Sequence, residues 1–217
     1  MGARAADRQR GAEVNEFVWY SDAMPHPSNM RPLRTDVSAD DVDRVIAASA
    51  RIRNGVPLDP DDVPRQVFGG ISAKDHTYRP PHLFKAGGCW FVSGAAAAVL
   101  RDFDLGGGRL QRIEFLQKDR ATPVEGDYFC IDFGNAKQAL LPAQSKNIEP
   151  GGQGRYIFSK ILHEGDLVVS RAALAGPDIW IDTLMWDALF LSGPLGTALG
   201  RAKVTKGFFL MKCPVAD

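Results

Sequence analysis

The stretch "CWFVSGAAAAVL" at residues 89–100 decides the fold, because a Ser-Gly step joins a strand-like apolar run to a helix-like run of alanines. A serine in that place accepts a hydrogen bond from a backbone amide two or three residues ahead and so begins a helix. Residues 189–199, "LFLSGPLGTAL", repeat the same order. Each copy is followed by a glycine-containing break and a second apolar run, "RLQRIEFL" or "GFFLMKCPV". The sequence therefore predicts two strand-helix-strand units.

The likeness of the two units has two explanations, and the sequence leaves both open. Phe, Ser, Gly and the final Leu are identical across the ten residues that begin at Phe91 and at Phe190. Four shared positions fit either an ancient duplication or convergence on common cap chemistry. Ser93 and Ser192 are predicted to cap helices rather than to act as nucleophiles, because neither lies in a G-x-S-x-G elbow. Ser170, in "LVVSRAAL", receives the same interpretation.

The segment "SADDVDRVIAASARIRNG" at residues 38–55 predicts a longer helix. Ser38 is the expected cap, Asp41 stands at capping-box spacing, and Gly55 is expected to end the helix. The predicted buried face consists of residues that share one side of a helix, namely Val42, Val45, Ile46, Ser49 and Ile52. Prolines, glycines and polar residues fill residues 57–81, so a long connecting loop is expected there.

Short strand-like runs outnumber the helical ones, which predicts an α+β fold: a mixed, mostly antiparallel sheet with short capping helices and a strand-helix-strand pseudo-repeat. A chain of 217 residues with 45% hydrophobic content can bury one substantial core. We expect a single domain over residues 16–217. Residues 1–15 have no apolar periodicity and are expected to form a flexible tail.

The overall charge is balanced, with 26 basic and 26 acidic residues. This balance argues against a nucleic acid or an anionic membrane as the partner. The chain also lacks the apolar segment of a signal peptide and the roughly 18 consecutive apolar residues of a membrane span, so a soluble cytoplasmic protein is expected. Its three cysteines are widely spaced among apolar residues and are predicted to be free thiols.

No motif predicts a catalytic residue, a metal site or a cofactor. The glycines of "DLGGGRL" lack the Gly-Lys-Ser/Thr ending that grips phosphate, and "PGGQGR" is expected to be a loop tip. His26, His76, His82 and His163 are not at metal-ligand spacing. Two alternatives stay open: a hydrolase-like enzyme whose pocket combines loop histidines with a serine or cysteine such as Ser93 or Cys89, and a non-catalytic scaffold.

The clearest local charge lies between residues 36 and 62, where seven aspartates face three arginines and give a net charge of minus four. Such a patch favours a basic protein partner, although the helix macrodipole and ordinary turns also explain part of it. The segment "GPDIWIDTLMWDALFLS" is apolar enough for the core, but its two tryptophans are also typical interface anchors. The candidate partner-binding residues are therefore Asp40, Asp41, Asp59, Asp61, Asp62, Trp180 and Trp186.

Three segments together resemble a family of bacterial polymorphic-toxin immunity proteins, formerly catalogued as a domain of unknown function. They are "GVPLDPDDVPRQVFGG" followed by "LFKAGGCWFVSGAAAAVL", then "IEFLQKDRATPVEGDYFCIDFGNAKQAL", and finally "DLVVSRAALAGPDIWIDTLMWDALFLSGPLGTALGRAKVTKGFFLMKCPV". In the last segment, the Ile-Trp step, the Phe-x-Ser entry into a short helix and the closing strand are the most similar features.

This resemblance implies that a cognate toxin is encoded nearby and is neutralised by non-covalent binding, which blocks its active site or its access to substrate. Such a function needs no catalytic residue. The resemblance transfers no defined binding residues, and the neutral charge of the chain leaves the chemistry of the toxin open. The oligomeric state is not indicated by the sequence.

Overall fold

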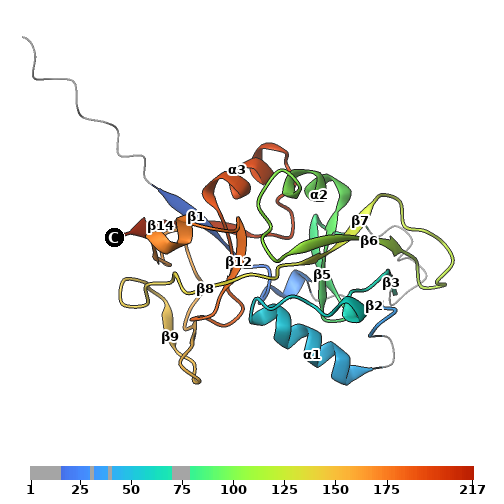
Figure 1. The fold of residues 1–217 in the computed structure, drawn as a ribbon, viewed down its shortest axis with the longest axis horizontal. Coiled ribbons are helices and arrows are strands. Elements are labelled where there is room, and N and C mark those ends of the chain that lie inside the picture. The colour runs from blue at the N-terminus through green and yellow to red at the C-terminus, as the bar shows by residue number, and fades with distance from the viewer. Residues whose placement is uncertain (1–15, 30–31, 39–40, 70–78) are drawn as a thin grey trace, which may run out of the picture.

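The computed structural model describes residues 16–29, 32–38, 41–69 and 79–217 (Figure 1). The predicted tail at residues 1–15 lies outside the described residues, as do Asp40 and His76. Within the described residues, no helix combines the length and the hydropathy that a membrane span requires.

Two six-stranded sheets form the framework. The strand order of sheet 1 is β11 (Val169–Ser170), β14 (Leu210–Ala216), β1 (Phe17–Ser21), β13 (Leu189–Leu191), β12 (Ile179–Asp182) and β8 (Ala136–Lys137). The strand order of sheet 2 is β2 (Leu33–Thr35), β3 (Gln66–Gly69), β6 (Arg109–Phe115), β7 (Tyr128–Asp132), β5 (Cys89–Ser93) and β4 (Leu83–Ala86). A separate hairpin pairs β9 (Ile148–Pro150) with β10 (Tyr156–Phe158).

Antiparallel pairing dominates both sheets. Among the described strands, the parallel pairs are β3 with β6, β8 with β12, and β11 with β14. The described residues also form three helices, α1 (Val42–Arg53), α2 (Gly94–Leu100) and α3 (Gly193–Arg201). Together with the sheets, they confirm the predicted α+β class with mixed, mostly antiparallel sheets.

The two predicted strand-helix-strand segments have the same place in their sheets. In sheet 1, α3 connects β13 to β14, and β1 lies between these strands, antiparallel to both. In sheet 2, α2 connects β5 to β6, and β7 lies between them in the same way. The helix α3 packs against β1, α2 packs against β5 and β7, and the two helices contact each other (Figure 1).

The caps of these helices follow the sequence-based prediction. Oγ of Ser93 accepts the amide of Ala96 at 3.3 Å, and Oγ of Ser192 accepts the amide of Leu195 at 3.2 Å. Both serines are therefore confirmed as helix caps. For Ser170 the prediction is wrong in its chemistry, because the short 3-10 helix that follows (Arg171–Leu174) begins without a hydrogen bond from the serine side chain.

Helix α1 differs from the prediction at its start and is confirmed at its end. Its cap is Asp41, whose Oδ1 accepts the amide of Arg44 at 3.0 Å. Ser38 is not the cap, because its hydroxyl lies 2.6 Å from the hydroxyl of Thr35. Gly55 ends the helix with a φ of 63°, a left-handed conformation that glycine adopts without a steric penalty.

The buried face of α1 also differs from the prediction. Ala48 and Ile52 are buried, whereas Val42 is 72% exposed and Ile46 is 61% exposed. The contact of α1 with β5 selects the side of the helix on which Ala48 and Ile52 lie, one turn apart. The predicted 57–81 loop is likewise only partly correct, because it contains the strand β3.

The core consists of two apolar clusters. The larger one joins both sheets, since it includes Trp90 and Phe91 of sheet 2, Leu189 of sheet 1 and Leu199 of α3. The smaller one lies on the other face of sheet 1. Cys89, Cys130 and Cys213 are buried and free, as predicted.

Candidate functional site

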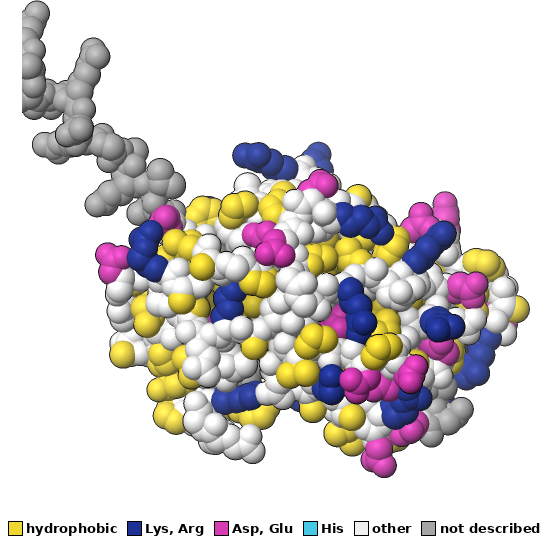
Figure 2. All heavy atoms as spheres, in the orientation of Figure 1, with side chains coloured by type: hydrophobic (Ala, Val, Ile, Leu, Met, Phe, Trp, Pro, Cys, Tyr) yellow, Lys and Arg dark blue, Asp and Glu magenta, His cyan; other side chains and the backbone are white. Residues whose placement is uncertain are grey.

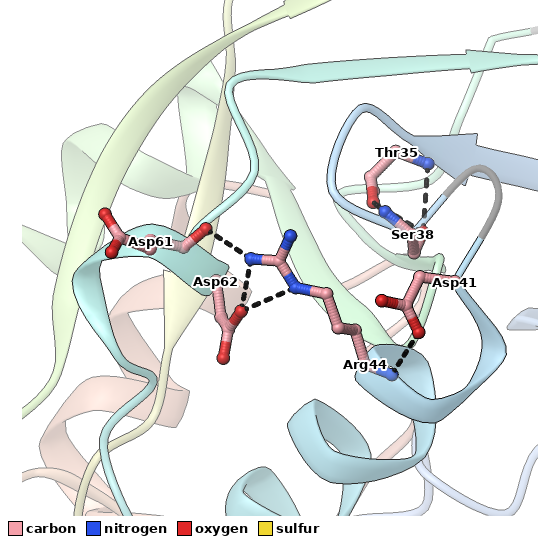
Figure 3. Close-up of polar contacts among 6 residues, drawn as sticks. All are labelled: Thr35, Ser38, Asp41, Arg44, Asp61 and Asp62. Carbon is pink, nitrogen blue, oxygen red and sulfur yellow. Dashed lines mark hydrogen bonds and ion pairs between the residues drawn. The ribbon is translucent and has the colours of Figure 1, made fainter.

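The predicted acidic residues gather on one surface, which we call the acidic face. It consists of Asp41, Asp43, Asp59, Asp61 and Asp62, from the first turn of α1 and the short 3-10 helix η2 (Pro60–Asp62). Nε and Nη2 of Arg44 bind Oδ1 of Asp62 at 3.0 and 2.5 Å, and Nη2 also donates to the Asp61 carbonyl at 2.9 Å (Figure 3). These contacts fix η2 against α1.

Arginines offset part of the predicted negative charge. Arg51 forms an ion pair with Asp59 at 3.0 Å, and the carboxylate of Asp41 is used as the cap of α1 (Figure 3). Asp43 and Asp61 are exposed, and neither forms an ion pair with a described residue. Binding of a partner by Asp41, Asp59, Asp61 and Asp62 stays a prediction.

Two exposed apolar side chains lie on α1 about half a turn around the helix axis from Arg44 and Arg51, the residues that bind η2. Val42 and Ile46 are four residues apart on α1 and therefore adjacent on the same side of the helix. Figure 2 shows acidic and basic side chains alternating over α1, with hydrophobic side chains between them. An exposed apolar pair rimmed by charges is typical of a protein-binding surface. Sequence reasoning missed this pair because it assigned both residues to the core.

The two candidate tryptophans differ in their surroundings. Trp180 is fully buried and stacks on Phe190 with ring centroids 5.7 Å apart, so its prediction as a partner contact is corrected to a core position. The reason is that every residue of β12 is buried. Trp186 is half-buried, and the guanidinium of Arg155 lies 4.4 Å from its ring. Trp186 thus stays a candidate surface residue.

The turn that carries Trp186 is tied to the end of α1. Asp187 forms an ion pair with Arg53 at 2.7 Å, and Arg155 donates a hydrogen bond to the Asn54 side chain. Trp186 therefore lies beside the carboxyl end of α1, whereas the acidic face extends from the first turn of α1 to Asp59, which is paired with Arg51 in the last turn.

A serine and a histidine meet at the start of α2. Nδ1 of His82 lies 2.6 Å from Oγ of Ser93. Burial and the nearby Lys206 lower the pKa of His82, which favours a neutral ring. A catalytic triad also needs a carboxylate that orients the histidine, and among the described residues none hydrogen-bonds to His82. The pair therefore matches the cap function of Ser93 better than a nucleophilic one.

Among the described residues, neither Cys130 nor any group of histidine, cysteine and acidic side chains forms a reactive-thiol site or a metal site. Cys130 is buried, and a hydrogen bond with Cys89 together with burial raises its thiol pKa well above the usual range. A raised pKa disfavours the reactive thiolate. In the described part of the chain, no three His, Cys, Asp or Glu side chains are grouped closely enough to hold a metal ion.

Two apolar grooves adjoin each other, each with a volume of about 620 Å³. The first, which we call the aromatic groove, is lined by Phe17, Trp19, Gly200, Lys206, Phe209 and Lys212, among others. The second lies beside His26 and Ile161. Phe209 and Leu210 line both. Sequence reasoning missed the grooves because their walls come from opposite ends of the chain; the aromatic runs "EFVWY" and "GFFL" were the available signal.

The sequence matches no protein-family model and no curated protein. Its function is therefore inferred from its residues and their geometry.

Proposed function

We propose that this protein is an immunity protein, which binds a cognate bacterial toxin encoded nearby and blocks its active site or its access to substrate. The observation that carries the proposal is the exposed pair Val42 and Ile46, 72% and 61% exposed, on the same helix whose first turn contributes Asp41 and Asp43 to the acidic face. The resemblance to immunity proteins along residues 55–213 supports the same function.

In this proposal, the apolar side chains contribute affinity and the aspartates contribute association rate. Val42 and Ile46 lose contact with water when the toxin covers them, and buried apolar area is the main source of affinity in protein interfaces. Asp43 and Asp61 attract a basic surface and raise the association rate. The Arg44–Asp62 and Arg51–Asp59 pairs hold the surface in one shape before binding, which lowers the entropic cost of association.

The first test is co-expression with a neighbouring gene product that has been shown independently to be toxic. We expect the host to survive and a one-to-one complex to elute in size-exclusion chromatography. Continued toxicity without a complex would overturn the proposal for that pairing.

The surface itself is tested with matched variants in a binding titration. The double variant Val42→Ser with Ile46→Ser should weaken toxin affinity by at least about tenfold, since it removes two central apolar contacts. Asp61→Lys should slow association, and its effect should shrink in high salt. Ile161→Ser is the control, because Ile161 is 83% exposed but lies beside the second groove. Unchanged affinity in the double variant would exclude the Val42–Ile46 pair, and unchanged association in Asp61→Lys would exclude the acidic face, while leaving toxin binding in place.

We also propose that the two strand-serine-helix-strand units derive from one duplicated unit. Their equal strand arrangement and equal cap chemistry support this. The strands β4 and β12 add a further likeness, because each pairs antiparallel with the first strand of its unit. Sequences of divergent relatives test the proposal: under duplication, identity between the units should extend beyond the four shared positions, and under convergence it should stay confined to them.

A further inference from the structure

The aromatic groove has a rigid, preformed floor. The indole Nε1 of Trp19 donates to the Gly193 carbonyl at 3.2 Å, and a Cβ on Gly196 would lie 2.1 Å from the Trp19 ring. Phe17 packs edge-on against Trp19, with centroids 5.5 Å apart and planes at 85°. Because α3 presses directly on the indole, the floor does not need to reorganise before it receives a ligand.

One wall of the groove is kept open by a glycine. Gly200 lies within α3, where glycine is less favourable than alanine. A Cβ there would meet no described atom within 4 Å, so packing against the rest of the described chain does not require a glycine. Its missing side chain instead leaves space in the groove, of which Gly200 is a lining residue.

The opposite wall contains an aromatic residue in an unfavourable backbone conformation. Phe209 has a φ of 49°, which is rare for a bulky side chain. Its ring stacks on His26 at 3.7 Å, and its carbonyl accepts the amide of Asp22 at 3.2 Å. Unfavourable backbone conformations that neighbouring contacts enforce are concentrated at ligand sites.

The groove is positively charged. Lys206 and Lys212 line it, and its described lining contains no carboxylate. Neither ammonium group forms an ion pair with a described residue. Nζ of Lys212 instead lies 5.1 Å from the ring centroid of Phe17 and 5.5 Å from that of Trp19. The apolar floor and the two cations therefore meet at the same place.

We propose that the aromatic groove binds a small amphipathic anion, with an aromatic or aliphatic body on Phe17, Trp19 and Phe209 and a carboxylate or similar group between Lys206 and Lys212. Charge complementarity selects an anion, and the ring-lined floor selects an apolar body. The volume of about 620 Å³ lies in the range of small-molecule sites.

A small molecule suits this groove better than an extended peptide. Peptides commonly dock by adding a strand to a free sheet edge. β14 is paired with β1 along Leu210–Pro214, and on its other side it pairs with β11 at Val215 and Ala216 and accepts the amide of Gly165 at the Lys212 carbonyl. The groove also lies away from the acidic face, since α3 and α1 are on opposite sides of the molecule (Figure 1). The inference is therefore independent of toxin binding at α1.

The test uses the full chain and two fluorescent probes of nearly the same shape. One is 1-anilinonaphthalene-8-sulfonate, an amphipathic anion, and the other is N-phenyl-1-naphthylamine, which lacks the sulfonate. We expect saturable binding of both at a single site, with dodecanoate displacing the anionic probe. Gly200→Leu should fill the groove and weaken both probes by at least about tenfold. Lys206→Gln and Lys212→Gln should each weaken the anionic probe by about three- to tenfold and leave the neutral one unchanged.

The same titrations include control variants. Lys203→Gln removes a nearby charge outside the lining and should change neither probe. Gly200→Ala is the smaller substitution at the same position. It should weaken probe binding less than Gly200→Leu does if lost space, rather than misfolding, is responsible. Thermal melting confirms that each variant is folded. Unchanged binding in both Gly200 variants would overturn the proposal, as would equal weakening of both probes by the lysine variants. Displacement of the probe by the toxin but not by dodecanoate would assign the groove to a protein and also overturn it.

Discussion

Nδ1 of His82 lies 2.6 Å from Oγ of Ser93, the same oxygen that accepts the Ala96 amide at the start of α2. One hydroxyl thus connects the end of the 79–82 segment to the first turn of a helix in the core. Burial and Lys206 lower the pKa of His82, so the folded protein favours the neutral ring. This coupling makes stability depend on pH.

Stability should fall as the pH drops below about 6.5, the ordinary pKa of a histidine in an unfolded chain. Between that value and the lowered pKa of folded His82, the unfolded state binds more protons than the folded state. The contribution is complete above about 6.5 and is lost as the pH falls through the folded pKa. Urea unfolding at pH 7.5 and at pH 5.5 gives the free energy of unfolding at each pH. In His82→Gln, whose side chain cannot be protonated, the difference between these two free energies should be smaller. An undiminished difference in the variant would assign the pH dependence to other groups.

Ser93→Ala should lower the free energy of unfolding by more than Ser192→Ala does. Each substitution removes one cap hydrogen bond, worth about 1 kcal/mol. Ser93→Ala also removes the contact with His82, worth about 0.5–1.5 kcal/mol more. Denaturant unfolding of both variants gives the difference directly. Equal losses would mean that the His82 contact contributes nothing to stability.

Gly55→Ala should be strongly destabilising, with Gly176→Ala as its matched control. Both glycines have a left-handed φ, 63° and 72°, which costs about 1–2 kcal/mol for alanine. A Cβ on Gly55 would lie 2.2 Å from the Asn135 carbonyl oxygen, whereas a Cβ on Gly176 would meet nothing within 4 Å. The clash should add about 1–3 kcal/mol at Gly55 alone. Thermal unfolding of the two variants would contradict this prediction if their midpoints shifted equally.

Replacing Trp180 with alanine should lower the free energy of unfolding by more than replacing Trp186 does. Trp180→Ala leaves a large cavity in a fully buried site and should cost about 3–5 kcal/mol. Trp186→Ala removes a half-buried ring and its contact with Arg155, and should cost about 1 kcal/mol. Unfolding curves followed by circular dichroism compare them. A larger loss in Trp186→Ala would show that the turn, rather than β12, limits stability.

Local signals predicted the elements that local chemistry determines. Ser93 and Ser192 mark the starts of α2 and α3 because a cap needs only its own first turn, and Gly55 marks an end for the same reason. The strand β3 was missed because it is four residues long and is held by distant partners, β2 and β6.

Nonlocal packing determined what the sequence did not reveal. Trp180 and Trp186 stand in one apolar segment, yet their burial depends on how sheet 1 is covered. Val42 and Ile46 fit a helical periodicity, but the strand behind α1 selected a different side. The aromatic groove combines residues 17–19 with residues 196–212, a proximity that no short window contains.

The position of β1 between β13 and β14 also sets an order of events during synthesis. Phe17 pairs with Pro214, so roughly two hundred further residues must be synthesised before β1 can pair with β14. At about 5–20 residues per second, that delay is roughly 10–40 s. Sheet 2, whose strands all lie between residues 33 and 132, can assemble in the meantime. During this interval β1 has no partner strands and its aromatic side chains are exposed, so we expect chaperones to bind this segment.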